Sequence, residues 1–275
     1  MLSLVGLGLE PGDISLKGAR LAREADVVYL EKYTSIVLDE TEIEAVLGRE
    51  VKHAYREEIE GAGGSEPFII EEASSKNVVL LVVGTPLFAT THTELLIRAQ
   101  ELGIPVRVLH NASIQSAFGC CGFNSYGFGR TVSIPFFIEN WRPYDFVRKI
   151  MENFSSGLHT LCLLDIKINE PTLETLLGKE DRRYTRFMTI PEAVSQIQEA
   201  AQHCGVTQLA GAKAVAIERL GLPSEEFTYG TLEDLQKREY GPPLHSIIIP
   251  SAHGNEMERE CVERFFQARG TAEQN

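Results

Sequence analysis

The sequence contains none of the short motifs that mark the common hydrolytic and phosphate-transferring enzymes. There is no G-x-S-x-G nucleophile turn, no P-loop ending in Gly-Lys-Ser or Gly-Lys-Thr, and no H-E-x-x-H zinc motif. The five cysteines include no C-x-x-C pair, and the adjacent Cys120 and Cys121 have no further Cys or His at ligand spacing. We therefore expect reduced cysteines, no bound metal, and a cofactor that carries its own reactivity.

Long apolar segments and an excess of positive charge are also missing. No apolar run reaches about 18 residues, and no basic region precedes the apolar N-terminus, so we expect neither a membrane span nor a signal peptide, and a cytoplasmic location. Acidic residues outnumber basic ones by 39 to 26, and the net charge of −13 argues against nucleic acid as a partner. The acidic surface suits a cationic cofactor or a basic patch on a protein substrate, and solubility alone explains it equally well.

The remaining composition is that of an ordinary globular protein. Of the 275 residues, 43% are hydrophobic and 24% are charged. This length allows one large domain or two moderate ones, and we favour two. The polar tail at 271–275 is expected to fray.

The most informative stretch is VVLLVVGTPLFATTHTELLIR at 78–98. Its uninterrupted, β-branched run at 78–83 predicts a parallel strand that is buried on both faces. A Gly-Thr-Pro sequence ends that strand, and Thr91 with Glu94 forms the capping-box pattern of a helix start. The loop between them therefore lies at the carboxyl end of a strand, where open α/β sheets bind their ligands.

The first strand, expected at 2–7, leads into GLGLEPGDIS, a glycine-containing turn before a helix that Asp13 would cap. A dinucleotide-binding fingerprint would need a glycine where this chain has Pro11, and Gly12 comes one place late. The second strand ends at Glu31, which either holds a ribose, as in nicotinamide-dependent oxidoreductases, or is solvated. An oxidoreductase is thus an alternative that the broken fingerprint disfavours.

Strands and helices alternate up to residue 111, which predicts a parallel, doubly wound sheet in an N-terminal α/β domain over 1–112. A glycine- and aromatic-rich segment then begins at His110 and marks the boundary. The C-terminal α/β domain, 113–275, has longer loops and favours a mixed sheet with helices, and we expect the cofactor cleft between the domains. Helices are expected near 16–25, 40–47, 91–102, 143–154, 191–203, 232–239 and 256–267, and strands near 26–30, 51–55, 105–109, 131–135, 159–166, 213–219 and 244–249.

Several blocks of this sequence resemble those of the diphthine synthases, a family of methyltransferases related to the tetrapyrrole methylases. In order along the chain they are GLGLEPGDIS, YTS at 33–35, GTPLFATTHTELLIRA, HNASIQSAFGCCGF, HTLCLLDIK and PPLHSIIIP. The resemblance implies a two-domain, tetrapyrrole methylase-like fold, the cofactor S-adenosyl-L-methionine, and a homodimer.

By the same resemblance, the residues that bind the cofactor act mostly through backbone groups and shape. They would be Leu9, Thr85, Phe88, Ser113, Ile114, Leu164, Leu220 and His245. The resemblance supplies no catalytic acid, base or nucleophile. The chain departs from the family at Thr85, where Asp is common, and the missing negative charge predicts weaker binding of the cofactor.

The implied substrate is a histidine of translation elongation factor 2 that already carries an aminocarboxypropyl group, an intermediate in diphthamide biosynthesis. HNASI and GCCG look like the eukaryotic type, which also methylates a carboxylate and yields diphthine methyl ester. The growing ammonium group could lie against aromatic faces, for which the loop positions suggest Tyr33, Phe118, Tyr126 and Phe128. A small-molecule methylase acting on tetrapyrrole precursors is the alternative with the same fold, whereas a non-catalytic adaptor has no support from the polar loops.

Overall fold

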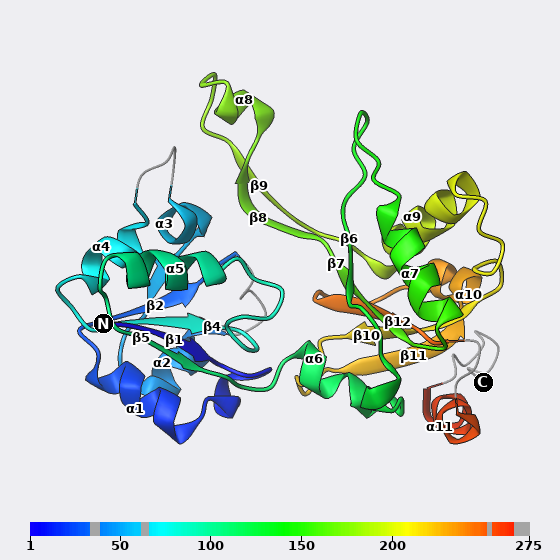
Figure 1. The fold of residues 1–275 in the computed structure, drawn as a ribbon, viewed down its shortest axis with the longest axis horizontal. Helices are drawn as coiled ribbons and strands as arrows, with labels where there is room; N and C mark the ends of the chain where they lie inside the picture. The colour runs from blue at the N-terminus through cyan, green and yellow to red at the C-terminus, as the bar shows by residue number, and fades with distance from the viewer. Residues whose placement is uncertain (34–38, 62–65, 252–254, 267–275) are drawn as a thin grey trace. The chain divides into compact units, whose positions relative to one another are not determined.

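The computed structural model describes residues 1–33, 39–61, 66–251 and 255–266, and the chain divides into two compact units (Figure 1). Unit 1 comprises Met1–Ala117 and Lys167–Thr185, and unit 2 comprises Phe118–Ile166 and Arg186–Asn275. The sequence predicted a boundary after residue 112, and the first segment of unit 1 ends at Ala117. The sequence gave no sign that Lys167–Thr185 groups with unit 1. The predictions made for residues 34, 35 and 271–275 fall outside the described residues.

Unit 1 is built on a parallel sheet with the strand order β3-β2-β4-β1-β5. The central strands β1 and β4 are buried along their whole length, as their apolar runs predict for strands covered on both faces. The predicted parallel sheet is therefore confirmed. Its strands are β1 Leu2–Gly6, β2 Val27–Glu31, β3 Lys52–Ala54, β4 Val78–Val82 and β5 Val106–Leu109.

Helices cover both faces of this sheet, as a doubly wound fold requires (Figure 1). On one face lie α1 Leu16–Glu24 and α2 Glu40–Leu47; on the other lie α3 Arg56–Glu60, α4 Phe68–Ala73 and α5 Thr93–Glu101. The sequence pattern did not predict α3 and α4, which are short.

Two predicted helix caps are wrong. Ser15, not Asp13, caps α1, because its hydroxyl accepts a hydrogen bond from the Gly18 amide at 3.0 Å while Asp13 binds the turn before it. The helix α5 starts two residues later than its pattern suggests, and the Thr91 hydroxyl donates to Glu60 instead of capping the helix. Asp13 is engaged by the amides of the turn that precedes it, and Thr91 by a residue of another helix.

Unit 2 contains the predicted mixed sheet, in the order β11-β10-β12-β7-β6. β6 and β7 are parallel, and the other neighbouring pairs are antiparallel. The strand β11 was not predicted. The strands are β6 Val132–Ile134, β7 Thr160–Leu164, β10 Lys213–Glu218, β11 Glu226–Thr231 and β12 His245–Ile249; the helices are α6 Ile114–Ala117 at the end of unit 1, then α7 Asp145–Ser155, α9 Ile190–His203, α10 Leu232–Lys237 and α11 Glu256–Phe266.

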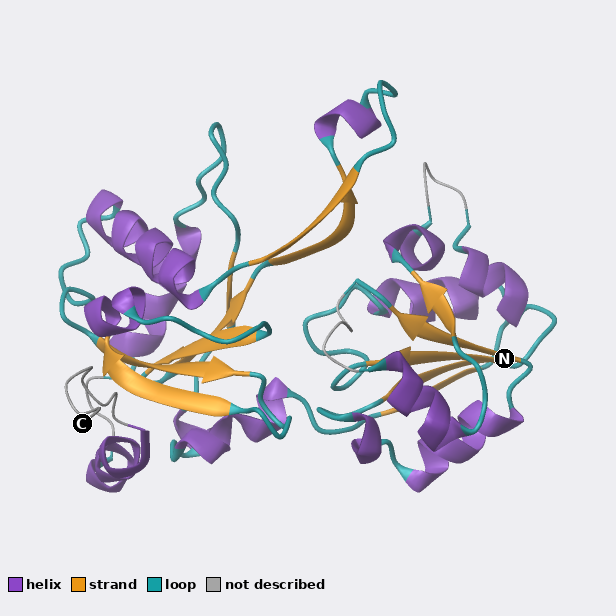
Figure 2. Ribbon diagram, turned by 180° about the vertical axis from the view of Figure 1, so that it is seen from behind, coloured by secondary structure: helices purple, strands orange, loops and turns teal. Residues whose placement is uncertain are grey.

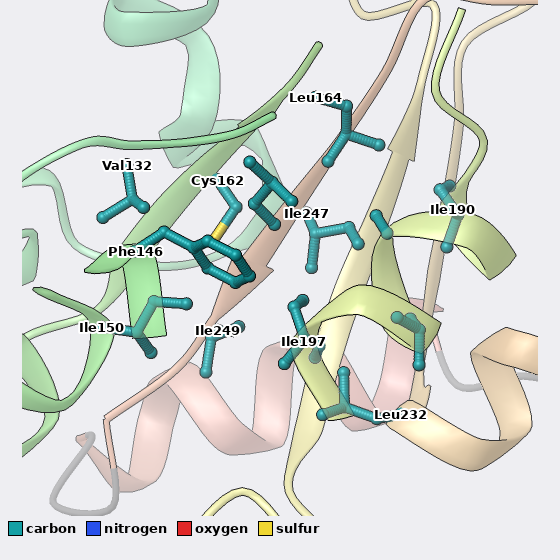
Figure 3. Packing of buried hydrophobic residues seen from close by; sticks show 14 of the residues in the cluster. Val132, Phe146, Ile150, Cys162, Leu164, Ile190, Ile197, Leu232, Ile247 and Ile249 are labelled. Atoms are coloured by element: carbon teal, nitrogen blue, oxygen red, sulfur yellow. The ribbon is translucent and has the colours of Figure 1, made fainter. Parts of the chain in front are cut away.

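The core of unit 2 lies between this sheet and the helices α7, α9 and α10 (Figure 3). Phe146 of α7 and Ile197 of α9 pack toward Cys162 and Ile247 on neighbouring strands, and all four are buried. Burial raises the pKa of the Cys162 thiol to about 12, so it stays protonated and packs as a small apolar side chain.

A two-stranded antiparallel ribbon, β8 Ile166–Pro171 and β9 Arg183–Phe187, carries the short helix α8 Leu173–Leu176 (Figure 2). Two ion pairs join this ribbon to α3: Arg56 with Glu170 at 3.4 Å and Arg183 with Glu57 at 2.9 Å. The ribbon escaped prediction because β9 is largely exposed and has no apolar alternation. Within the described ranges, no helix has the length and hydropathy needed to span a membrane.

Candidate active site

Three loops follow the carboxyl ends of β1, β4 and β5 and meet at one edge of the unit 1 sheet, which we call the unit 1 edge: residues 7–13, 83–92 and 110–113. Gly8 and Gly84 join the first two loops, since the Gly84 amide donates to the Gly8 carbonyl at 2.7 Å and the reverse bond is 3.2 Å long. Asn111 joins the third loop to the first, because its amide group donates to the carbonyl oxygens of Gly6 at 3.0 Å and Asp13 at 2.9 Å.

The glycines at this edge are required by close backbone contact. A Cβ at Gly6 would lie 2.6 Å from the Gly84 carbonyl oxygen, and one at Gly8 would lie 2.3 Å from the Asp13 Cβ. Gly8 and Gly84 also have φ angles of +87° and +71°, which side-chain-bearing residues rarely adopt. The turn that looked like a broken dinucleotide fingerprint therefore serves to bring two loops into contact.

Four of the predicted cofactor residues, Leu9, Thr85, Phe88 and Ser113, lie in the loops of the unit 1 edge, and a fifth, Ile114, follows the third loop directly. The Leu9 amide donates to Asp13 at 2.9 Å, and the Phe88 amide donates to the Thr85 carbonyl at 3.3 Å. The Thr85 hydroxyl lies 3.2 Å from Nδ1 of His110. Ser113 is buried directly before Ile114, which opens α6.

The other three predicted residues lie at one edge of the unit 2 sheet. Leu164 ends β7, Leu220 follows the end of β10, and His245 begins β12. His245 pairs with Glu218 of β10, and the next residue of β12 pairs with β7 one position before Leu164. We call Leu164, Leu220 and His245 the unit 2 edge.

His245 has one buried nitrogen with an open hydrogen-bonding position. Its Nε2–H donates to the carbonyl oxygens of Gly241 and Pro242, each at 3.1 Å. Burial lowers the pKa of His245 against the opposing effect of the Glu218 carboxylate, so the ring is neutral near pH 7. Nδ1 then carries a lone pair and has no hydrogen-bond partner among the described residues. A buried acceptor of this kind is costly to leave unpaired, so it fits a donor N–H of a bound ligand.

Asp13 and Asn111 are important at the unit 1 edge, but sequence reasoning did not assign them these roles. Asp13 accepts from the amides of Leu9 and Glu10 at 2.9 and 3.3 Å, and so shapes the first loop. Asn111 belongs to the HNAS block, but no local pattern in the sequence indicates its contacts with Gly6 and Asp13. For Asp13, a short polar residue directly after Gly12 was the available signal.

The four aromatic candidates are not equivalent. Phe118 and Phe128 pack on each other, with ring centroids 4.0 Å apart, whereas Tyr126 is 93% exposed. Tyr33 is buried, and the Arg56 guanidinium already lies 5.2 Å from its ring centroid. The Tyr33 ring already contacts the cationic side chain of Arg56, so its contacts suit a structural role better than the binding of a substrate ammonium group. Across the described part of the chain, no cluster of three or more His, Cys, Asp or Glu side chains could hold a metal ion.

Comparison with known proteins gives the family. The model of the Tetrapyrrole (Corrin/Porphyrin) Methylases matches residues 1–236. Diphthine methyl ester synthase 2 of Candida albicans is 42% identical, over 96% of this chain and 89% of the relative. Diphthine methyl ester synthase of Homo sapiens is 40% identical, over 99% of this chain and 98% of the relative.

Solved structures agree with these relatives. A crystal structure of a protein from Entamoeba histolytica assigned as a diphthine synthase has a TM-score of 0.85 and 34% identity, covering 98% of this chain and 99% of that one. A second diphthine synthase crystal structure has a TM-score of 0.80 and 34% identity, covering 97% of this chain and 96% of that one. Fold and sequence thus point to the same group of enzymes.

Proposed function

Because this chain belongs to the tetrapyrrole methylases, and within them to the diphthine methyl ester synthases, we propose that it methylates the modified histidine of translation elongation factor 2, with S-adenosyl-L-methionine as methyl donor. The product would be diphthine methyl ester, in the biosynthesis of diphthamide. The observation that carries this proposal is the identity of about 40% to diphthine methyl ester synthases over nearly the whole chain.

The residues at both sheet edges fit S-adenosyl-L-methionine. The bound cofactor supplies a methyl group made electrophilic by the sulfonium, so the protein needs to align donor and acceptor and exclude water. His245 offers an unpaired, buried acceptor that matches an N–H donor. At the unit 1 edge, the contact between Gly8 and Gly84 holds the first two loops together and so places Leu9 close to the loop of Thr85 and Phe88. We propose that the residues that bind the cofactor are Leu9, Thr85, Phe88, Ser113, Ile114, Leu164, Leu220 and His245.

In this reaction, the protein must bind the amine of the modified histidine in its neutral form. An ammonium group has no lone pair to attack the methyl, so each transfer to the amine must follow loss of its proton to solvent, whereas the carboxylate attacks in its ionised form. A site that excludes water favours that loss, because it disfavours the charged form of the amine. This requirement calls for a desolvated surface and for no particular acid or base, which agrees with the absence of a catalytic motif from the sequence.

The proposal is tested by transfer of labelled methyl groups from S-adenosyl-L-methionine to elongation factor 2. The substrate carries the aminocarboxypropyl histidine, unmodified factor is the control, and mass analysis of the histidine peptide counts the methyl groups. We expect labelling that depends on the modification, with four methyl groups for the methyl ester and three for the amine alone. Labelling of a tetrapyrrole precursor with none of the protein would replace this proposal by the small-molecule methylase.

We also propose that the enzyme is a cytoplasmic homodimer, on the strength of its resemblance to the family. Light scattering at a series of protein concentrations tests the oligomeric state, and a mass equal to one chain throughout would rule the homodimer out. Fractionation of cells with a tagged chain tests the location.

A further inference from the structure

Two buried polar aromatic residues, His92 and Tyr33, hold the loop at 83–92, which we call the central loop, and neither is among the predicted cofactor residues. His92 is the residue before α5 and is fully buried, and Tyr33 follows β2 and is 4% exposed. Buried polar groups destabilise a fold unless they are hydrogen-bonded. The hydrogen-bond partners of these two side chains therefore identify the segments that the side chains connect.

His92 bridges the end of the central loop to its beginning. Its Nδ1 lies 2.9 Å from the Pro86 carbonyl, which can only accept, so Nδ1 carries the proton. Burial lowers the pKa of His92, against the carboxylates of Glu31 and Glu60, and keeps the ring neutral. Nε2 is then an acceptor, and the Tyr33 hydroxyl, 3.2 Å away, donates to it.

Tyr33 is fixed in turn by its own neighbours. Its backbone amide donates to the Glu31 carboxylate, and the Arg56 guanidinium of α3 covers its ring. Thr91, whose hydroxyl lies 3.2 Å from that of Tyr33, donates to Glu60 at the other end of α3 at 2.7 Å. The central loop is therefore connected to the end of β2 through Tyr33 and to α3 through Thr91.

The loop between these attachments has a backbone that needs outside support. Ala89 has a φ of +56°, in the left-handed region that residues with a Cβ rarely occupy. Such a conformation persists when surrounding contacts over-determine it. The Pro86 carbonyl oxygen accepts hydrogen bonds from both His92 and Thr90, the latter at 2.6 Å. These two bonds connect the beginning of the loop to its end.

We propose that His92 and Tyr33 are positioning residues that hold the loop from Thr85 to Thr91 in the conformation that binds the methyl donor. Thr85 and Phe88, the two predicted cofactor residues in this loop, lie on either side of Pro86, whose carbonyl oxygen His92 binds. The inference rests on the proposed function, because it assigns this loop to the binding of S-adenosyl-L-methionine. Neither side chain touches the cofactor; both act through the loop.

Tyr33→Phe is the primary test, and Tyr29→Phe is its matched control. Tyr29 is 3% exposed in the middle of β2, and its hydroxyl donates to Glu72 at 2.7 Å. Each variant removes the hydroxyl of a buried tyrosine in or directly after β2: Tyr33→Phe loses the contacts with His92 and Thr91, and Tyr29→Phe loses the bond to Glu72, so both should lower Tm. The Kd for S-adenosyl-L-methionine, measured by calorimetry, should rise roughly two- to tenfold in Tyr33→Phe and stay unchanged in Tyr29→Phe.

His92→Asn adds a second, independent measurement. The asparagine amide can replace the donation to Pro86 but does not reach Tyr33, so this variant should bind the cofactor more tightly than His92→Ala. Adding Tyr33→Phe to His92→Asn should weaken binding no further, because both changes remove the same hydrogen bond.

Equal Kd values for Tyr33→Phe, Tyr29→Phe and the unchanged chain would overturn the positioning role while leaving the proposed function intact. Failure of the unchanged chain to bind S-adenosyl-L-methionine would overturn both. An additive effect of the two changes in the double variant would show that Tyr33 does not act through His92.

Discussion

Replacing His245 by glutamine should weaken binding of the methyl donor without much loss of stability. The glutamine amide nitrogen reaches the position of Nε2, so the variant keeps a donor for the carbonyl oxygens of Gly241 and Pro242. It has no acceptor at the position of Nδ1, the buried atom that lacks a partner among the described residues. The change therefore separates the ring's structural bond from its proposed ligand bond.

The size of the effect follows from that single bond. A hydrogen bond to a neutral buried acceptor contributes about 0.5–1.5 kcal/mol, which corresponds to a roughly two- to tenfold rise in Kd. His245→Asn is the complementary variant, since its side-chain oxygen can accept near Nδ1 but its amide does not reach the two carbonyls. We expect His245→Asn to bind the cofactor more tightly than His245→Gln and to unfold at a lower temperature.

Isothermal titration with S-adenosyl-L-methionine and thermal unfolding of the same samples measure both effects. If His245→Gln binds as tightly as the unchanged chain, Nδ1 does not face the cofactor and the reasoning fails. If the rise in Kd and the fall in unfolding temperature keep the same ratio in both variants, His245 stabilises the fold and makes no separate bond to the cofactor.

Three further outcomes are expected. Thr85→Asp, which restores the charge common in the family, should lower the Kd for S-adenosyl-L-methionine, and an unchanged Kd would contradict the role given to this position. Ile247→Ala, at a fully buried site in the unit 2 core, should lower the free energy of unfolding in urea by about 2–5 kcal/mol, and a loss under about 1 kcal/mol would mean that the core relaxes around the cavity. Burial lowers the pKa of His92, His159 and His245 below the ordinary value of 6.5. Their contribution to the free energy of unfolding should therefore be complete above pH 6.5 and decrease as the pH falls below it, because these histidines then gain protons in the unfolded chain and not in the folded one. Equal urea midpoints at pH 7.5 and 5.5 would refute this.

The sequence by itself determined the larger part of the fold. Uninterrupted apolar runs such as Val78–Val82 are long, strongly patterned signals, and they placed the parallel sheet of unit 1 correctly. The resemblance of ordered blocks supplied the family and the eight cofactor positions, which remain predictions. These features depend on local pattern and on linear motifs, which a sequence contains directly.

Only the tertiary structure decided which partner each polar side chain takes. Thr91 has the spacing of a helix cap, yet its hydroxyl donates to Glu60, more than thirty residues away in the chain. Tyr33 looked like a loop aromatic open to a substrate cation, whereas Arg56 covers its ring and His92 takes its hydroxyl. The largely exposed strand β9 had no apolar alternation to reveal the ribbon that it forms with β8. A hydrogen bond between distant residues leaves no periodic trace in the sequence, and its geometry exists only once the sheet has brought its loops together.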